Sequence, residues 1–455
     1  MKKSILASIL IFSFFNQNFA DEIKLSLKEA MKIVSKDNYN LKQARLEVSS
    51  ATYQKELVET NKYPKVTFEV SAFLINEMKT KNDPISFTLP GLPPPDNTVN
   101  LPPFDTVTPD HLYKAELTIL QPLYLGGAIK NNLEATSRMV KNKSEILLQA
   151  KQDVLFQTVA AYFNVVRAQK SFDVEDKILQ LSKKNLEDVL VKFEAKAITK
   201  YELIRAESDV LEAEIAYNQA YSDFENSKYD LANILQIAPN FTLTDSFAFV
   251  ENDPDVEKEI AVAIKNRYDI KSYESLIGAF DSQSKAVDSE YKPLVYFKAS
   301  GGVQMPEMGL FGGEDNFGPT YQVGLAVQWN VFDGFKKNSR KNIIENDKYK
   351  WRAQQLILIE KIKTEVRKAC INIMQSKKLV ETSIKAQEKS GEVYNLVVVG
   401  YQNQKNTQLE LLDARLQMSK SYRNLVNATF RHELARVQLD YITGRFSEDM
   451  NPLSK

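Results

Sequence analysis

The sequence has very little cysteine and histidine. Its 455 residues include one cysteine, Cys370, and two histidines, His111 and His432. A single thiol excludes an intramolecular disulfide framework and a thiolate-rich metal cluster. The two histidines lie too far apart in sequence to form a close-spaced metal pair. No nucleophile–base pair or repeated carboxylate–histidine spacing is present, so the sequence predicts no catalytic residues, no cofactor and no metal site.

The sequence also lacks a charge excess and a long apolar run. It has 59 basic and 59 acidic residues, so the chain has no net positive charge that would attract nucleic acid. Residues 1–20 read as a secretory signal peptide, because Lys2 and Lys3 precede an apolar run that ends before Ala20. The remainder, 21–455, has no apolar stretch of about 18 residues, the length of a membrane-spanning helix. Any membrane insertion must therefore use strands.

Proline and glycine are missing from long segments. All sixteen prolines lie within 64–122, within 239–319 or at position 452, and residues 128–190 also lack glycine. Proline inside a helix costs about 3 kcal/mol, so these segments are free to be helical. Apolar residues recur every seven positions along 128–190. They are Leu133, Val140, Leu147, Val154, Ala161 and Ala168. This spacing predicts a long supercoiled helix, on the order of 95 Å.

An internal repeat organises the chain. Residues 123–127 align with 331–335 at an offset of 208, and the same offset aligns 161–164 with 369–372. A gap-free offset over such a length indicates two copies of one unit, which we place at about 26–238 and 255–444. The pattern within each copy predicts the same order of elements: a medium helix, a strand, a loop, a strand, a long helix, a turn and a medium helix. The first medium helices are expected at 26–62 and 255–291.

Four segments alternate apolar and polar residues, with aromatic residues at their ends. The expected strands are 65–75, 112–123, 294–304 and 320–331. Segments of about ten residues with this alternation are typical of a transmembrane β-barrel, although a half-buried soluble sheet gives the same alternation. Four strands cannot close a barrel, so three copies would supply twelve. The connections at 76–111 and 305–319 are expected to be extracellular loops.

The doubled unit resembles the TolC family of outer-membrane efflux channels. The resemblance rests on Tyr-Leu-Gly-Gly at 124–127, Phe-Asp-Gly-Phe at 332–335, and the segments 193–206 and 401–414. It implies a mainly α fold with a transmembrane β-barrel. A homotrimer would form a twelve-stranded barrel in outer-membrane lipid, continued by a twelve-helix coiled-coil α-barrel in the periplasm. The implied function is the exit duct of a tripartite efflux pump or type I secretion system, with a periplasmic adaptor and an inner-membrane pump or ABC transporter as partners.

The resemblance also assigns a site to the periplasmic tips, at about 193–200 and 401–408. It implies that Glu410 and Asp413, one helical turn apart, ring a channel constriction that favours cations. The alternative is that Glu410 and Asp413 are ordinary solvated charges on the helix surface, with no role in selectivity. The candidate tip or adaptor contacts are Lys196, Thr199, Lys200, Tyr401, Gln404 and Asn406. The family commonly has glycine at the positions of Lys196 and Gln404, so we expect both turns to follow a slightly different backbone route.

Two other classes of protein fit part of the pattern. A soluble periplasmic coiled-coil adaptor or binding protein would explain the helices but not the four alternating strands. A structural surface stalk would have the same elements without a conduit. The cargo is not encoded in any motif, because the inner-membrane partner selects it.

Overall fold

The computed structural model describes most of the chain after the expected signal peptide. The described residues are 23–74, 79–81, 85–90, 98–101, 105–107, 111–246, 249, 251, 253–305, 307–309, 312–314 and 316–447. The signal peptide predicted at 1–20, and parts of the expected loops 76–111 and 305–319, lie outside these residues. The chain divides into two compact units. Unit 1 contains 1–49, 141–274 and 353–455, and unit 2 contains 50–140 and 275–352.

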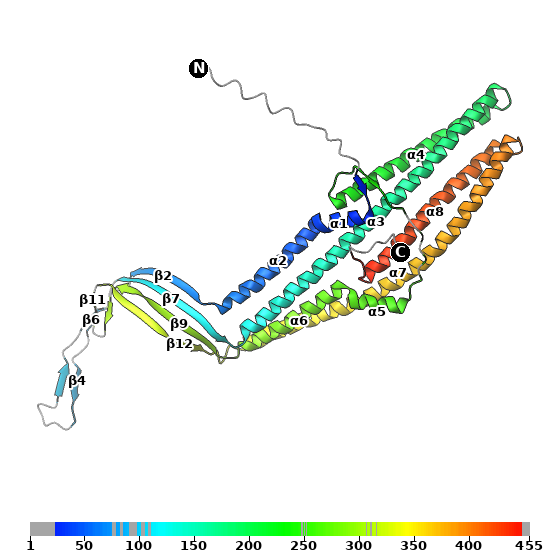
Figure 1. Ribbon diagram of the computed structural model, residues 1–455. Coiled ribbons are helices and arrows are strands. Elements are labelled where there is room, and N and C mark those ends of the chain that lie inside the picture. Colours follow the sequence, from blue (N-terminus) through cyan, green and yellow to red (C-terminus); the bar gives the residue numbers. More distant parts are fainter. Residues whose placement is uncertain are drawn as a thin grey trace, which may run out of the picture. The chain divides into compact units, whose positions relative to one another are not determined.

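Helices dominate the described chain (Figure 1). They are α1 (Leu27–Asp37), α2 (Tyr39–Glu59), α3 (Ala128–Glu194), α4 (Lys200–Leu235), α5 (Val256–Asn266), α6 (Tyr268–Ser289), α7 (Lys336–Gln402) and α8 (Gln408–Ile442), with a 3-10 turn at Thr60–Lys62. The prediction of a mainly α fold with very long helices is confirmed, since α3 and α7 each contain 67 residues. Among the described helices, none combines the length and apolarity needed to cross a bilayer.

The expectation of single helices at 26–62 and 255–291 was wrong. One extended residue interrupts each of them, Asn38 between α1 and α2 and Arg267 between α5 and α6. The Asn38 side chain accepts a hydrogen bond from the backbone N–H of Asn40 at 2.9 Å. This N–H lies in the first turn of α2 and has no partner within the helix, so the bond caps α2. A break of one residue leaves the apolar spacing on either side nearly intact, so periodicity did not reveal it.

Unit 2 contains a four-stranded antiparallel sheet. Its strands are β2 (Lys65–Leu74), β7 (His111–Leu125), β9 (Leu294–Met305) and β12 (Gly318–Gln328), in the order β12-β9-β7-β2. One register row joins Val66, Ile119, Ala299 and Val323, and the next row joins Thr67, Thr118, Ser300 and Gln322. Because side chains alternate between faces, one face of the sheet is apolar and the other polar. On the edge strands, the apolar side chains are exposed.

Short strands continue from this sheet into segments that the sequence analysis treated as loops. The strands are β3 (Lys79–Lys81), β4 (Ile85–Thr88), β5 (Thr98–Leu101), β6 (Asp105–Val107), β10 (Glu307–Gly309) and β11 (Gly312–Glu314). They pair antiparallel as β3 with β6, β4 with β5 and β10 with β11. Strands of three or four residues are too short to give a readable alternation, so the sequence did not predict them.

The apolar core of unit 1 surrounds the middle of α3. Tyr162 and Phe163 are fully buried there, beside β1 (Ile23–Leu25), which pairs in parallel with β8 (Phe241–Leu243). The single O–H of Tyr162 lies between two acceptors, the Leu25 carbonyl oxygen at 3.0 Å and the Asp245 carboxylate at 2.9 Å. Burial, together with the Asp245 carboxylate, raises the pKa of Tyr162 well above its usual range. Cys370 is buried in a second apolar cluster on α7, as a small core residue.

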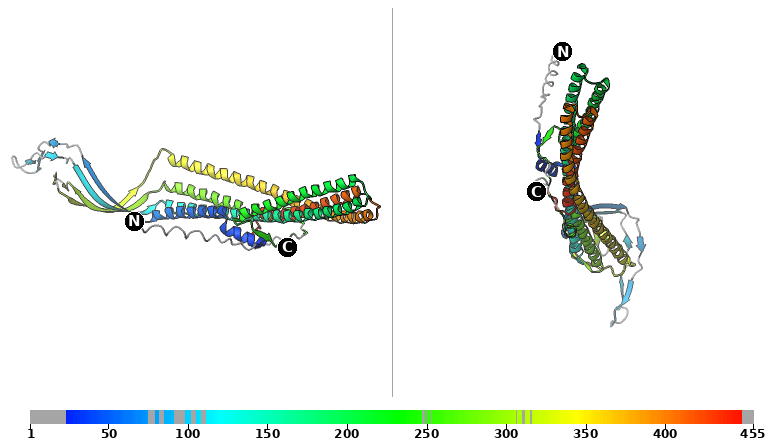
Figure 2. Two further views of the ribbon diagram at one scale, coloured as in Figure 1. Left: turned by 90° about the horizontal axis from the view of Figure 1, so that it is seen from above. Right: turned by 90° about the vertical axis from the view of Figure 1, so that its right-hand side faces the viewer.

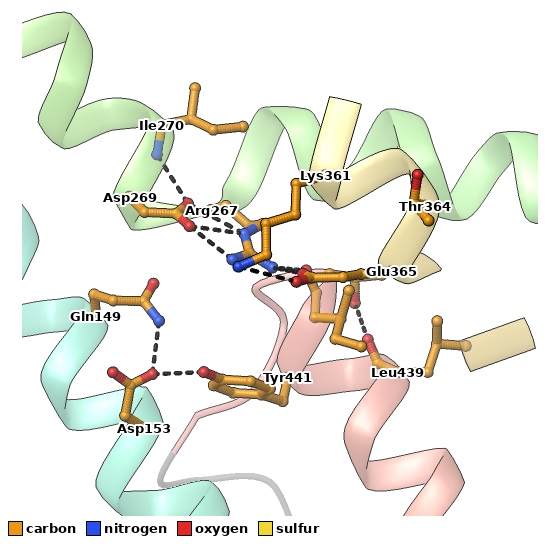
Figure 3. A network of polar contacts seen from close by, with 12 residues as sticks. Gln149, Asp153, Arg267, Asp269, Ile270, Lys361, Thr364, Glu365, Leu439 and Tyr441 are labelled. Atoms are coloured by element: carbon orange, nitrogen blue, oxygen red, sulfur yellow. Dashed lines mark hydrogen bonds and ion pairs between the residues drawn. The ribbon is translucent and has the colours of Figure 1, made fainter. Parts of the chain in front are cut away.

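A polar network at the α5–α6 break holds several helices of unit 1 together (Figure 3). The Arg267 guanidinium donates to Asp269 at 2.6 Å and to the Ile442 carbonyl at 3.1 Å, and lies 3.5 Å from Glu365. The Tyr441 hydroxyl donates to Asp153 on α3 at 2.7 Å. Contacts from α6, α7 and α8 therefore converge on the residue that interrupts the helix.

Candidate functional site at the helical tips

Two helical hairpins of unit 1 end in short turns. Residues 195–199 join α3 to α4, and residues 403–407 join α7 to α8. Figure 2 shows α4 and α8 with the adjoining parts of α3 and α7 as one bundle that carries both turns at the same end. The candidate residues of the sequence analysis lie in these turns or in the first turns of α4 and α8.

Both turns close with the same hydrogen bonds. Lys196 and Gln404 have left-handed φ values of 58° and 57°. The Ala197 N–H donates to the Lys192 carbonyl at 2.9 Å, and the Lys405 N–H to the Gly400 carbonyl at 2.7 Å. These are Schellman turns, in which the left-handed residue is normally glycine. Each of the two side chains therefore adopts the backbone conformation that glycine favours.

Threonines begin both following helices. The Thr199 and Thr407 hydroxyls accept from the backbone N–H groups of Glu202 and Glu410, each at 3.3 Å. In return the Thr407 N–H donates to a Glu410 carboxylate oxygen at 2.7 Å, and the Thr199 N–H to Glu202 at 2.9 Å. These are capping boxes. Capping was the alternative to a partner contact for a threonine at such a turn, and the sequence pattern Thr-x-x-Glu in each hairpin was the signal for the complete box.

Glu410 is held in place by its own hairpin. The same carboxylate oxygen accepts from the Asn406 amide at 3.2 Å. The backbone bond from Thr407, then the side-chain bonds from Asn406 and Thr407, lower the pKa of Glu410. The carboxylate is therefore ionised at neutral pH and oriented toward the turn. The position of the Glu410 carboxylate is therefore fixed by the cap of α8, whether or not it also faces a channel.

Asp413 lies one turn further along α8, is exposed, and has no ion-pair partner among the described residues. A groove of about 420 Å³ brings it together with Glu410 and Asn406 on one side and Lys389 of α7 on the other. Asp413 also lines a groove of about 490 Å³ between α4 and α8. Of the two predicted constriction residues, Asp413 is thus the one whose charge is unshared.

The remaining tip candidates divide into two groups. Lys196, Lys200 and Gln404 are exposed, and among the described residues no ion pair engages either lysine. Tyr401 instead packs between the hairpins, with the Lys192 ammonium 4.1 Å from its ring centroid. Burial raises the pKa of the Tyr401 hydroxyl, and nearby Glu202 and Asp188 add to this. The structure therefore leaves three of the candidates free for a partner and uses Tyr401 internally.

Sequence reasoning missed the ion pairs that join the hairpins. Arg415 of α8 pairs with Asp209 of α4, and Arg423 of α8 lies 2.9 Å from Glu175 of α3. Arg415 is buried, with 5% of its side chain exposed. It occupies a seam position between Leu411 and Met418, at helical spacings of four and three. A charged residue on an otherwise apolar seam was the available signal.

Comparisons with known proteins point to one family. The chain matches the family model described as outer membrane efflux protein over residues 32–235 and 260–445. It is 21% identical over 333 residues to the outer membrane efflux protein BepC of Brucella suis, covering 72% of this chain and 71% of that protein. It is also 21% identical over 315 residues to nodulation protein T of Rhizobium leguminosarum, covering 66% and 65%.

Solved structures of outer-membrane channels share the fold. The CmeC channel of Campylobacter jejuni has a TM-score of 0.73 and 16% identity, covering 94% of this chain and 87% of that one. CusC has a TM-score of 0.72 and 14% identity, covering 95% and 96%. The open-state MtrE channel of Neisseria gonorrhoeae has a TM-score of 0.70 and 17% identity, covering 92% and 88%.

Proposed function

Because this chain belongs to the outer membrane efflux protein family, we propose that it works as a homotrimer whose subunits together form one exit duct. The chain is an outer-membrane efflux duct with its helices in the periplasm. In the proposed assembly, three sheets join into a twelve-stranded barrel, and the helices continue as a twelve-helix tunnel that ends at the tips. The duct carries small molecules or protein from an inner-membrane pump to the outside.

The observation that carries the proposal is the open sheet of unit 2. Its outer strands, β2 and β12, have no strand partner on their outer edges within the described chain. Open edges in hydrocarbon leave backbone N–H and C=O groups without hydrogen bonds, at a cost of several kcal/mol each. One face also exposes a band of apolar side chains. Pairing β2 of one subunit with β12 of the next removes both edges and turns the apolar face to lipid.

The tip supplies the constriction. In a trimer, three copies of Asp413 and Glu410 would place six carboxylates around one axis, which attracts cations and obstructs anions. Asp413 is the principal selectivity residue, because its charge has no ion-pair partner among the described residues. Glu410 contributes charge, but its carboxylate is also committed to the cap of α8.

The groove between α4 and α8 is the proposed contact for a periplasmic adaptor. Exposed apolar side chains, Ile204, Leu409 and Leu416, line it beside the carboxylates of Glu212 and Asp413. These carboxylates outnumber the one guanidinium among the described residues of the groove, that of Arg205. An amphipathic helical hairpin with basic residues flanking an apolar stripe would match this surface. Exposed Lys196, Lys200 and Gln404 at the turns extend the contact. Through the adaptor, the duct would connect to an inner-membrane pump or ABC transporter.

Purification and bilayer recording test the proposal. The mature chain, extracted in detergent, is expected to run as a trimer in native mass spectrometry and to give cation-selective conductance in planar bilayers. A stalk without a conduit would form an oligomer that does not conduct. A soluble periplasmic adaptor would be released from membranes by carbonate washing. Release of a water-soluble monomer would therefore contradict both the barrel and the trimer.

A further inference from the structure

A pair of exposed aromatic rings lies where β12 leads into α7. The rings of Phe332 and Phe335 meet edge to face with centroids 5.6 Å apart, and their side chains are 72% and 66% exposed. Phe335 has a left-handed φ of 65°, a conformation that is strained for a phenylalanine. Its counterpart in the first repeat is Gly127, with a φ of 93°. The second repeat thus holds a large apolar ring where glycine would serve without strain.

The turn itself does not require this ring. At the matching junction of the first repeat, a Cβ on Gly126 would lie 2.3 Å from the Ser289 carbonyl oxygen, so close packing demands glycine there. Gly334, which corresponds to Gly126, has no atom within 4 Å of such a position. Close packing therefore does not restrict the residue at position 334 of the second junction. Lys196 and Gln404 also have left-handed φ values, so this conformation alone assigns no function, and what distinguishes Phe335 is its exposed ring.

A set of polar contacts, called the platform here, connects residues that flank the two rings in sequence. The Trp329 indole N–H donates to the Tyr291 carbonyl at 3.1 Å, and the Tyr291 hydroxyl donates to Asn338 at 2.6 Å. The Lys337 ammonium lies 4.5 Å from the Tyr291 ring centroid and donates to the Asn330 carbonyl at 3.2 Å. These contacts connect the end of α6, the end of β12 and the start of α7 within unit 2.

Two lysines beside the platform have unshared charges. Lys292 and Lys336 are exposed, and neither has an ion-pair partner among the described residues. Their basic neighbours differ, since Arg340 pairs with Glu290 and Lys341 with Asp288, each at 2.8 Å. Lys292 directly follows Tyr291 and Lys336 directly follows Phe335. Each free cation is therefore adjacent in sequence to an aromatic residue of this surface.

We propose that this junction surface, made of Lys292, Trp329, Phe332, Phe335 and Lys336, binds an anionic phospholipid of the periplasmic leaflet. The inference rests on the proposed insertion of the sheet into the outer membrane. Lysines near a bilayer attract anionic headgroups, and aromatic rings settle at the boundary between headgroups and acyl chains. Lys292 and Lys336 contact the phosphate, while Phe332 and Phe335 enter the acyl boundary. In the first repeat, Tyr124 stands at the position of Phe332 and is 47% exposed, but Gly127 stands at the position of Phe335, so the pair of rings is specific to the second repeat.

Quenching of Trp329 fluorescence measures the lipid next to this surface. The chain has two tryptophans, so the Trp351→Phe variant reports Trp329 alone. The full-length protein is reconstituted in phosphatidylcholine vesicles with an equal share of phosphatidylglycerol, and one lipid or the other is brominated. Brominated phosphatidylglycerol is expected to quench more strongly, with a relative association constant higher by roughly tenfold. Lys292→Gln with Lys336→Gln should reduce this preference to near equality.

The matched control removes the same charge elsewhere. Lys368→Gln with Lys385→Gln, two exposed lysines further along α7, should retain the preference. Equal quenching by both lipids in the parent protein would overturn the inference, but it would still agree with insertion of the sheet into the membrane. Absence of quenching by either lipid would instead contradict the proposed barrel. Phe332→Ala with Phe335→Gly should weaken the association of both lipids in an oligomer of unchanged size, and unchanged quenching or a dissociated oligomer would contradict the role of the rings in lipid binding.

Discussion

Arg415 on α8 pairs with Asp209 on α4, and this contact ties the two tip hairpins of one subunit together. Both side chains are mostly shielded from water, with 5% and 20% exposed. An ion pair so placed is a poor source of net stability, but removing one partner leaves the other buried and uncompensated. The pair therefore specifies which faces of α4 and α8 meet.

Asp209→Ala is expected to destabilise the tip by about 2–3 kcal/mol, because Arg415 remains buried without a carboxylate. The measurement is hydrogen exchange over α4 and α8 in the detergent-solubilised protein. Arg415→Leu combined with Asp209→Ala should recover much of the loss. The exposed pair of Lys183 with Glu214, 3.3 Å apart, is the control, and Glu214→Ala should change little. A similar loss in both single variants would contradict the account.

Asp413→Asn is expected to reduce cation selectivity while leaving the stability of α8 unchanged, because the carboxylate has no ion-pair partner among the described residues. Reversal potentials across a salt gradient measure the selectivity. Glu410→Ala should both reduce selectivity and increase exchange of the first turn of α8, since it removes the capping box. Glu202→Ala removes the corresponding capping box from α4. It should increase exchange of the first turn of α4 and leave cation selectivity unchanged. Unchanged selectivity in Asp413→Asn would exclude the constriction role.

The cap of α8 should respond to acid in a defined direction. The pKa of Glu410 lies below its ordinary value of 4.5 because the carboxylate accepts hydrogen bonds from Thr407 and Asn406. A group with a depressed folded pKa stabilises the fold above its unfolded pKa, and this contribution is lost as the pH falls through the folded pKa. Protection factors, which correct the exchange rate for its intrinsic pH dependence, should be constant in the first turn of α8 from neutral pH to about 4.5 and decrease below it. Glu410→Gln should remove this step, and a step that persisted would assign it to another group.

Glycine at the left-handed positions should stabilise the turns. Lys196→Gly and Gln404→Gly relieve the strain of φ values near 58° and 57° and are each expected to add about 1 kcal/mol. Thermal unfolding in detergent measures the effect. Ala195→Gly, at a position whose φ is not positive, should lower stability instead. If both kinds of glycine destabilised the turn equally, the left-handed conformation would not be the cause.

Much of the fold followed from periodic patterns in the sequence. The absence of proline and glycine from 128–190 predicted the long helix α3, and the alternation around Val66 and Val323 predicted strands of the sheet. Such patterns are local, because a backbone period places side chains on one face whatever lies opposite. The interruptions at Asn38 and Arg267 escaped prediction, because a break of a single residue barely disturbs the period.

The candidate site was predictable only in part. The resemblance located the tips and named Glu410 and Asp413, but it did not show that Glu410 caps α8 while Asp413 has no ion-pair partner among the described residues. It also missed Asp209 with Arg415, which are separated by 206 residues and pair only because two hairpins pack together.

The sequence by itself determined the repeated order of helices and strands, since covalent chain geometry converts residue spacing into helical and extended segments. Only the tertiary structure decided which charges are shared and which are exposed. An ion pair depends on distances of a few ångströms between distant segments, and the open junction at Phe335 is recognised only once its surroundings are placed.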